Sequence, residues 1–177
     1  MANIDDFKAN LIGGGARANQ YRVTVTPPPG IAIGLDVRRT SFLVTASNLP
    51  AQTLAEITIP FRGRNIYIAG DRTFDEVWTT TFMNDTDFMI RDAMERWSNG
   101  INDFADATGV QSMSDYATDL TVEQLDRDGT TIKSYIFRNS WPSTIASIEL
   151  SSAEDTTIEE FACTWQYQHF EASGVNF

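Results

Sequence analysis

Alternation of apolar and polar side chains constrains the fold of this chain more than any other feature of its sequence. In residues 161–168 every second position carries a side chain suited to a core, namely Phe161, Cys163, Trp165 and Tyr167. Because successive side chains of a β-strand point to opposite faces, this run predicts a strand with one buried face. Shorter runs typical of strands occur at residues 21–25, 41–46, 54–59, 66–68, 74–83, 116–126 and 131–138. The Asp-Gly pair at 128–129 predicts a hairpin between the last two runs.

One segment follows a helical period instead. Large apolar residues recur at spacings of 4, 3, 4 and 3, at Ile90, Met94, Trp97, Ile101 and Phe104. This spacing places them on one face of an α-helix, whose start Asp85 or Thr86 can cap. We expect a helix over residues 86–106 that packs on the sheet of its own chain. The predicted fold is therefore mainly β, with two packed antiparallel sheets that form a β-sandwich or small barrel and one flanking amphipathic helix.

The composition fits a single domain over residues 1–177 with its own core. The chain is 42% hydrophobic and contains 11 Phe, 5 Tyr and 4 Trp, which argues against disorder. It has no run of about 18 apolar residues and no secretory signal, so we expect no membrane insertion and assembly in a cytoplasm. Residues 1–15 are expected to form a flexible N-terminal arm, with a short helix at 3–11 before the triple glycine at 13–15. Residues 171–177 are expected to form a C-terminal tail.

The residues that most often carry chemistry are scarce. The chain has one cysteine, Cys163, and one histidine, His169, which are too few for a His/Cys metal site. Asp75 and Glu76 belong to the densest charged cluster, but neighbours on a strand face opposite ways and cannot form a carboxylate pair by themselves. The sequence contains no phosphate-binding loop, dinucleotide fingerprint or nucleophile elbow. We therefore expect no catalytic, cofactor-binding or metal-binding residues and no enzymatic activity.

The charge is strongly acidic and unevenly distributed. The net charge of −11 at pH 7 argues against a protein that grips nucleic acid through its phosphates. Residues 1–72 contain eight Lys or Arg and five Asp or Glu, whereas residues 73–177 contain five against nineteen. This asymmetry fits an ordinary acidic surface, and it also fits a subunit whose copies meet head to tail. The charge pattern alone leaves both interpretations open.

A resemblance to a known family adds to what the composition and the residue patterns indicate. Residues 66–78 read Ile-Tyr-Ile-Ala-Gly-Asp-Arg-Thr-Phe-Asp-Glu-Val-Trp, and residues 82–85 read Phe-Met-Asn-Asp. The segment resembles the tail tube proteins of contractile-tailed (myovirus-type) bacteriophages, which are related to the tube proteins of type VI secretion and phage-derived injection systems. Three further segments agree in order: the start of a first strand at 16–21, a Leu-Pro turn at 46–50 and a bend at 138–151. The resemblance covers about residues 16–169.

The resemblance implies a structural virion protein. Members of the family fold as two packed antiparallel sheets with a helix, and six subunits close a ring. The inner sheets of the ring join into one continuous barrel, which removes exposed edge strands. The rings stack into the inner tail tube, the conduit for DNA ejection. The expected partners are other copies of the chain, the tail sheath, baseplate and tail terminator proteins, a tape measure protein inside the lumen, and DNA that passes without specific binding.

The resemblance also directs attention to particular residues. In the family a long loop reaches the next ring, and we place it at residues 59–71. The residues expected at inter-subunit or inter-ring contacts are Arg62, Arg64, Asp71, Arg72 and Asn84. A lumen that lets DNA pass is expected to be acidic, because carboxylates repel phosphate. The candidate lumen residues are Asp119 and Glu123, and the sequence leaves open which strand face looks inward.

Two alternatives stay open from the sequence. A tube subunit of a tailocin or a type VI secretion system would share the fold and the ring. A monomeric carbohydrate-binding or hydrolytic β-sandwich would use aromatic side chains such as Trp141 and Tyr135. The second alternative predicts a stable monomer whose melting temperature depends on a ligand, whereas a tube subunit forms rings or tubes without one.

Overall fold

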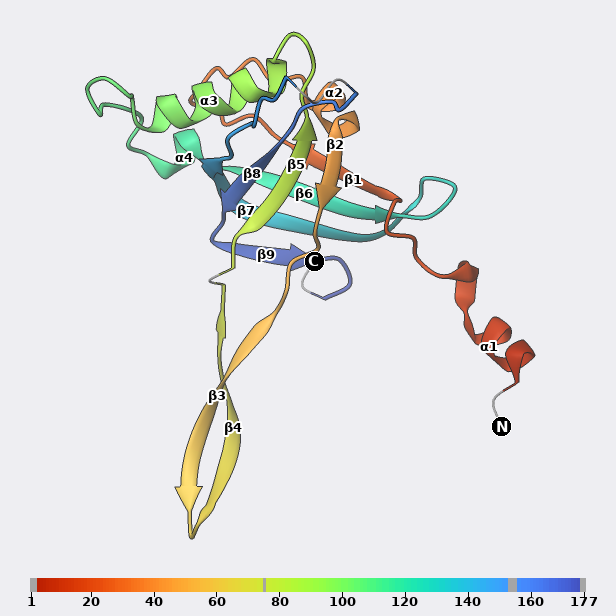
Figure 1. The fold of residues 1–177 in the computed structure, drawn as a ribbon. Coiled ribbons are helices and arrows are strands. Elements are labelled where there is room, and N and C mark those ends of the chain that lie inside the picture. Colours follow the sequence, from red (N-terminus) through yellow and green to blue (C-terminus); the bar gives the residue numbers. More distant parts are fainter. Residues whose placement is uncertain (1–2, 75, 153–155, 176–177) are drawn as a thin grey trace.

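The computed structural model describes residues 3–74, 76–152 and 156–175 of the chain, and it confirms a mainly β fold with few helices (Figure 1). The strands are β1 (Tyr21–Val25), β2 (Val44–Ser47), β3 (Thr53–Phe61), β4 (Arg64–Thr73), β5 (Trp78–Met83), β6 (Thr118–Leu125), β7 (Thr131–Ile145), β8 (Glu160–Gln166) and β9 (His169–Ala172). The helices are α1 (Ile4–Asn10), α2 (Val37–Phe42), α3 (Met89–Ile101) and α4 (Met113–Tyr116), and a 3-10 turn, η1, spans Ile12–Gly14.

Two antiparallel sheets share the long strand β7. Strands β1, β6, β7 and β9 lie in that order in one sheet, here called sheet A, and β2, β5, β8 and the end of β7 form sheet B. Residues Tyr135 to Arg138 of β7 pair with β9 in sheet A, and Trp141 to Ile145 pair with β8 in sheet B. Between these two parts Asn139 has a φ of 52°. Asn139, within the bend predicted at 138–151, therefore lies where one strand passes from one sheet to the other.

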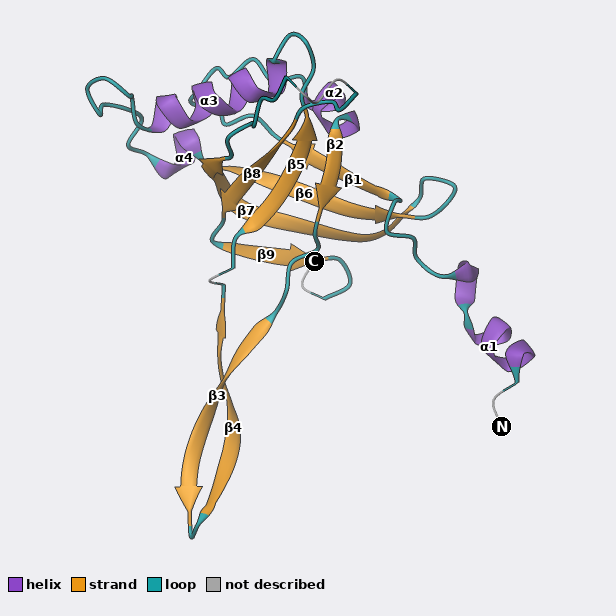
Figure 2. Ribbon diagram, in the orientation of Figure 1, coloured by secondary structure: helices purple, strands orange, loops and turns teal. Residues whose placement is uncertain are grey.

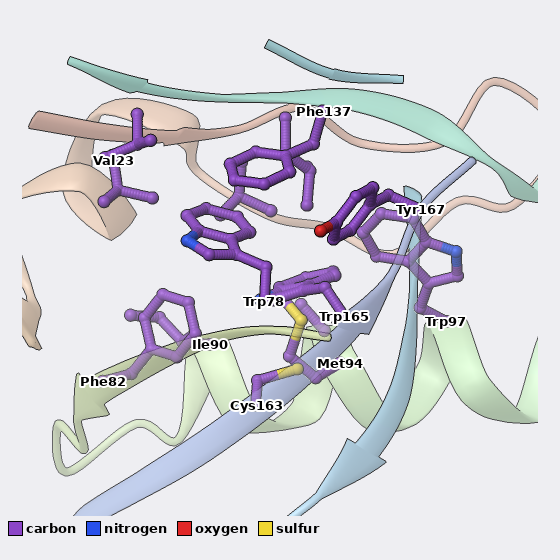
Figure 3. Close-up of a cluster of buried hydrophobic side chains, with 14 of the residues drawn as sticks. Val23, Trp78, Phe82, Ile90, Met94, Trp97, Phe137, Cys163, Trp165 and Tyr167 are labelled. Atoms are coloured by element: carbon purple, nitrogen blue, oxygen red, sulfur yellow. The ribbon is translucent and has the colours of Figure 1, made fainter. Parts of the chain in front are cut away.

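The core lies between the two sheets. In sheet B the cross-strand partners Trp78 and Trp165 are both buried, as are Phe82 and Phe161, because partners in an antiparallel pair share a face. Trp78 stacks on Phe137 of sheet A, with ring centroids 4.3 Å apart and ring planes 19° apart. Figure 3 shows these rings together in the core. The strand with one buried face that was predicted from the alternation in residues 161–168 is thus confirmed as β8, which ends at Gln166.

Helix α3 lies at one end of the sheets (Figure 1) and adds Ile90, Ala93, Met94 and Trp97 to the same core. The Trp97 ring meets the Trp165 ring edge-on at 5.5 Å. The predicted helix is confirmed, but it is shorter than residues 86–106.

The two ends of α3 explain the difference in length. The Oδ1 of Asp87, not a side chain of residue 85 or 86, accepts from the backbone N–H of Met89 at 3.1 Å. The residue before the helix, Phe88, has a φ of 53°. At the other end the helix stops at Ile101, and Phe104 is 83% exposed. Phe104 was therefore wrongly assigned to the apolar stripe.

Strands β3 and β4 form a separate two-stranded hairpin that projects away from both sheets (Figure 2). Residues 59–71, which the sequence assigned to a long loop, belong to this hairpin. Arg62 and Gly63 at its tip have φ values of 46° and 80°, which is the geometry of a tight hairpin turn with two left-handed residues. The loop assignment was wrong because an Arg-Gly turn lacks the usual Asn-Gly or Asp-Gly signal.

Three boundaries differ from the sequence prediction elsewhere. Residues 41–42 belong to α2, since Asp36 caps that helix by accepting from the N–H groups of Arg38 and Arg39 at 3.0 and 3.1 Å. The strand predicted at 74–83 starts at Trp78. Residues 171–172, assigned to a tail, are part of β9. The predicted helix near 3–11 is confirmed as α1.

Candidate assembly surfaces

Sheet A has two outer strands, each with one neighbour. Within the described residues β1 pairs with β6 alone and β9 pairs with β7 alone. Every pairing in the order β1, β6, β7, β9 is antiparallel, so β1 and β9 run in opposite directions. An outer strand presents backbone N–H and C=O groups that can pair with another chain. Sheet A can therefore be extended at both sides by further copies of itself, with every new pairing antiparallel.

The two predicted lumen residues lie together on the outer face of sheet A. Leu120 and Val122 of β6 point into the core, so the alternate residues Asp119 and Glu123 point outward. The structure thus brings both carboxylates onto the outer face of sheet A, and their position in a lumen stays a prediction.

The same face carries arginines that the sequence analysis missed. The Nη1 of Arg138 lies 2.5 Å from Oδ2 of Asp119, and its Nη2 lies 2.7 Å from Oε2 of Glu171. The Nη1 of Arg22 lies 3.4 Å from Oε2 of Glu123. The hydrogen bond from Arg138 lowers the pKa of Glu171, and the same pairing raises the pKa of Arg138. The outer face of sheet A is therefore a mixed, paired surface and not a purely acidic one.

The hairpin presents one apolar face to solvent. Ile57 pairs with Ile68 and Ile59 with Ile66, so these four side chains share a face with Phe61; these five residues are called the apolar hairpin face. Their side chains are between 42% and 55% exposed. The opposite face pairs Thr58 with Tyr67. An exposed cluster of large apolar residues on a soluble protein marks an interaction surface.

Four of the five predicted contact residues lie on this hairpin. Arg62 lies in the turn at the tip and Arg64 follows the turn; the Arg62 guanidinium lies 5.3 Å from the centre of the Phe61 ring. Asp71 and Arg72 lie at the base, and Arg72 donates to Oε1 of Gln52 at 2.7 Å. The structure therefore places these four residues on one projecting element, and their role in contacts between copies stays a prediction.

Asn84 lies apart from the other four. It is 8% exposed, its Nδ2 donates to Oε2 of Glu159 at 3.2 Å, and its backbone N–H donates to the carbonyl of Glu159 at 2.8 Å. These bonds join the end of β5 to the start of β8. The structure gives Asn84 a role within the subunit, and its assignment to a contact between subunits is untested.

Cys163 and the aromatic candidates for ligand binding pack against other residues of the described part of the chain. Cys163 is buried, and burial raises the pKa of its thiol. No group of three or more His, Cys, Asp or Glu side chains in the described part is placed to hold a metal ion. Trp141 and Tyr135, candidates for stacking on a sugar, pack edge-on against Tyr116 and Phe170 of their own chain. Within the described ranges no helix has the length and apolar character needed to span a bilayer.

Comparison with known sequences identifies the family. A family model described as phage tail tube protein matches residues 16–173, so this chain belongs to the phage tail tube protein family. It is similar to the tail tube protein of Serratia phage KSP90, at 28% identity over 169 residues covering 94% of this chain and 95% of that protein. It is also similar to the tail tube protein gp19 of Enterobacteria phage T4, at 30% identity over 171 residues covering 95% and 99%.

Comparison with solved structures agrees on the fold. A chain in the extended sheath-tube complex of the extracellular contractile injection system PVC has a TM-score of 0.55 and 14% identity, covering 95% of this chain and 97% of that chain. The family match over residues 16–173 confirms the resemblance predicted from the sequence. The chain is a structural tail tube protein of contractile phage tails, a component of the virion, with structural neighbours in contractile injection systems.

Proposed function

We propose that six copies of this chain close into a ring by joining the outer strands of sheet A, and that the rings stack into the inner tube through which DNA is ejected. The single observation that carries the proposal is the opposite direction of β1 and β9. When β9 of one copy pairs with β1 of the next, the new ladder is antiparallel like all the others. The contact is heterologous, and closure into a ring leaves no open sheet edge.

The hairpin supports a contact between rings. It extends beyond the sheets as a free element (Figure 2) and carries Arg62, Arg64 and Arg72. The second half of the chain, residues 73–177, carries nineteen acidic and five basic residues. We propose that the basic hairpin of one ring meets the acidic surface of the next, where opposite charges attract and favour one stacking direction.

The outer face of sheet A is proposed to line the lumen. Asp119, Glu123 and Glu171 supply three carboxylates on this face, and Arg22 and Arg138 are engaged in ion pairs with them. Arginines that are already bound to carboxylates are poor ligands for phosphate, so they release few counterions from DNA. DNA and a tape measure protein can therefore occupy such a lumen without specific binding.

The remaining partners follow from the place of a tube subunit in a tail. We propose contacts with a sheath outside the tube and with baseplate and terminator proteins at its two ends, and no catalytic role. The PVC structural neighbour is part of a sheath-tube complex, which supports the sheath contact. A tube subunit of a phage-derived injection system is the second candidate, because that structural neighbour belongs to such a system.

Electron microscopy of the purified protein tests the proposal. We expect hexameric rings or hollow tubes in negative stain, and light scattering after size exclusion should give a multiple of the 19.7 kDa subunit mass. A species of 19.7 kDa at every concentration, with or without a purified baseplate to nucleate assembly, would contradict it.

A further inference from the structure

The N-terminal arm, residues 3–15, carries an amphipathic helix whose apolar side is exposed, with none of the described residues covering it. Ile4, Phe7 and Leu11 are 70%, 66% and 44% exposed, and their spacing aligns them on one side of α1. No residue of α1 is buried. An isolated helix of seven residues is unstable in water unless its apolar side is covered. The arm therefore requires a binding surface to hold it in this form.

The apolar hairpin face is a second exposed apolar surface. Its residues Ile57, Ile59, Phe61, Ile66 and Ile68 form a two-stranded apolar surface that no other element of the described residues covers. Helices pack on sheets by covering such a face. Figure 1 shows α1 and the hairpin projecting from different sides of the sheets, so the arm does not reach the hairpin of its own chain in this structure.

The two surfaces match in length. From Ile4 to Leu11 the helical stripe extends roughly 10 Å at about 1.5 Å per residue. From Ile57 to Phe61 the apolar strip of β3 extends roughly 13 Å at about 3.4 Å per residue. The three apolar side chains of α1 therefore fit along the hairpin strip within its length.

The charges on the two elements also match, in one orientation. Asp5 and Asp6 lie in the first turn of α1, and Lys8 lies in its last turn. With its N-terminus toward the hairpin tip, α1 brings its carboxylates to Arg62 and Arg64. The reverse orientation would place Lys8 near these two arginines, and like charges repel.

We propose that α1 of one copy packs on the apolar hairpin face of a second copy, with its N-terminus toward the hairpin tip. The proposal rests on the self-assembly proposed above and adds a specific contact to it. The three consecutive glycines at 13–15 have φ values of 65°, 76° and 82°, which residues other than glycine rarely adopt. They let the arm leave its own body and reach a neighbouring copy.

Disulfide trapping between two variants tests the contact. One preparation carries Phe7→Cys and the other carries Ile59→Cys, and the two are mixed, assembled into tubes and oxidised. Because each chain has one introduced cysteine and Cys163 is buried, a disulfide between positions 7 and 59 must join two copies. We expect this disulfide to be found by mass spectrometry of the digested tubes.

Thr58→Cys is the matched control. Residue 58 adjoins residue 59 but lies on the opposite hairpin face, so we expect at least a tenfold lower yield of the 7–58 disulfide. Equal yields at 58 and 59 would overturn the assignment of the apolar hairpin face. A chain carrying both Phe7→Cys and Ile59→Cys that forms the disulfide as a monomer would also overturn the proposal, because the arm would then bind its own hairpin.

A Phe7→Ser variant gives a second readout. We expect its melting temperature as a monomer to equal that of the parent, because Phe7 is exposed, and its critical concentration for tube assembly to rise about tenfold because a phenylalanine contact is lost. Tubes that form as readily with Phe7→Ser and yield no 7–59 disulfide would overturn the arm contact while the proposed function stands. The absence of rings and tubes from the parent protein would contradict both.

Discussion

Trp165 donates its indole N–H to the hydroxyl of Thr80 at 2.8 Å, and both side chains are fully buried. The two residues lie on the adjacent strands β8 and β5, with their side chains on the same face of sheet B. A buried indole N–H without a partner carries a large desolvation cost. Thr80 is therefore a polar residue that the core requires, and the hydroxyl, not the size of the side chain, is the reason.

Replacing Thr80 by valine keeps the shape and removes the acceptor. We expect Thr80→Val to lower the free energy of unfolding by about 1–3 kcal/mol. Chemical denaturation of the monomer measures this change. Thr79→Val, on the opposite side of the same strand and half-buried, is the matched control and should change stability by less than about 0.5 kcal/mol. Equal effects at the two positions would contradict the role of the hydrogen bond.

Truncating Phe137 removes the ring that joins the two sheets. Phe137 is fully buried and stacks on Trp78, so Phe137→Ala should cost about 3–5 kcal/mol of stability. Thermal unfolding of purified monomer, or loss of soluble protein on expression, reports the effect. Ile132→Ala on the same strand is exposed and serves as the control. A stable, soluble Phe137→Ala protein would show that the stacking is not central to the fold.

The pairing of Arg138 with Glu171 predicts a dependence of stability on pH. The hydrogen bond from Arg138 holds the pKa of Glu171 below its usual value of 4.5, so the folded state favours the charged carboxylate. This stabilisation is present above about pH 4.5 and is lost as the pH falls through the lowered pKa. We expect part of the acid-side loss of stability to disappear in Glu171→Gln, measured by unfolding between about pH 6 and pH 3.

Glu149→Gln is the control for the pH experiment. Glu149 is exposed and forms no ion pair among the described residues. Its substitution should leave the pH profile unchanged. Identical profiles for the parent and Glu171→Gln would show that the Arg138 contact does not contribute to acid stability.

Reversing the charge at the hairpin tip tests the proposed contact between rings. Arg62 and Arg64 lie at the tip of an exposed hairpin, so Arg62→Glu with Arg64→Glu should leave the melting temperature of the monomer unchanged. We expect the double variant to form few or no tubes at about 0.1 M salt, because like charges then face each other across rings. Negative-stain images and sedimentation of tubes measure the outcome. Arg127→Glu, at an exposed turn between β6 and β7, is the control. If the double variant Arg62→Glu with Arg64→Glu gave as many tubes as the parent protein, the proposed role of the hairpin tip would be contradicted.

The strands and the helix of the core could be predicted because their signals are local. The period of two in residues 161–168 and the period of three to four at Ile90, Met94 and Trp97 each follow from burial of one face. The strand runs at 54–59 and 66–68 were predicted and lie in β3 and β4, but their pairing into one hairpin was missed because the turn at Arg62 and Gly63 lacks the Asn-Gly or Asp-Gly signal. The arginines on the outer face of sheet A were missed for another reason. Arg22 and Glu123 are 101 residues apart, and only the register of β1 against β6 brings them together.

The passage of β7 through both sheets has a mechanical consequence. Its backbone runs without interruption from the pairing with β6 and β9 into the pairing with β8. A load applied to sheet A, such as drag from a polymer moving along its outer face, is passed to sheet B through covalent bonds. The two layers can slide apart only if many backbone hydrogen bonds of β7 shear at once, which resists force far better than opening them one at a time. A subunit built in this way transmits load through its thickness without relying on the side-chain packing between its sheets.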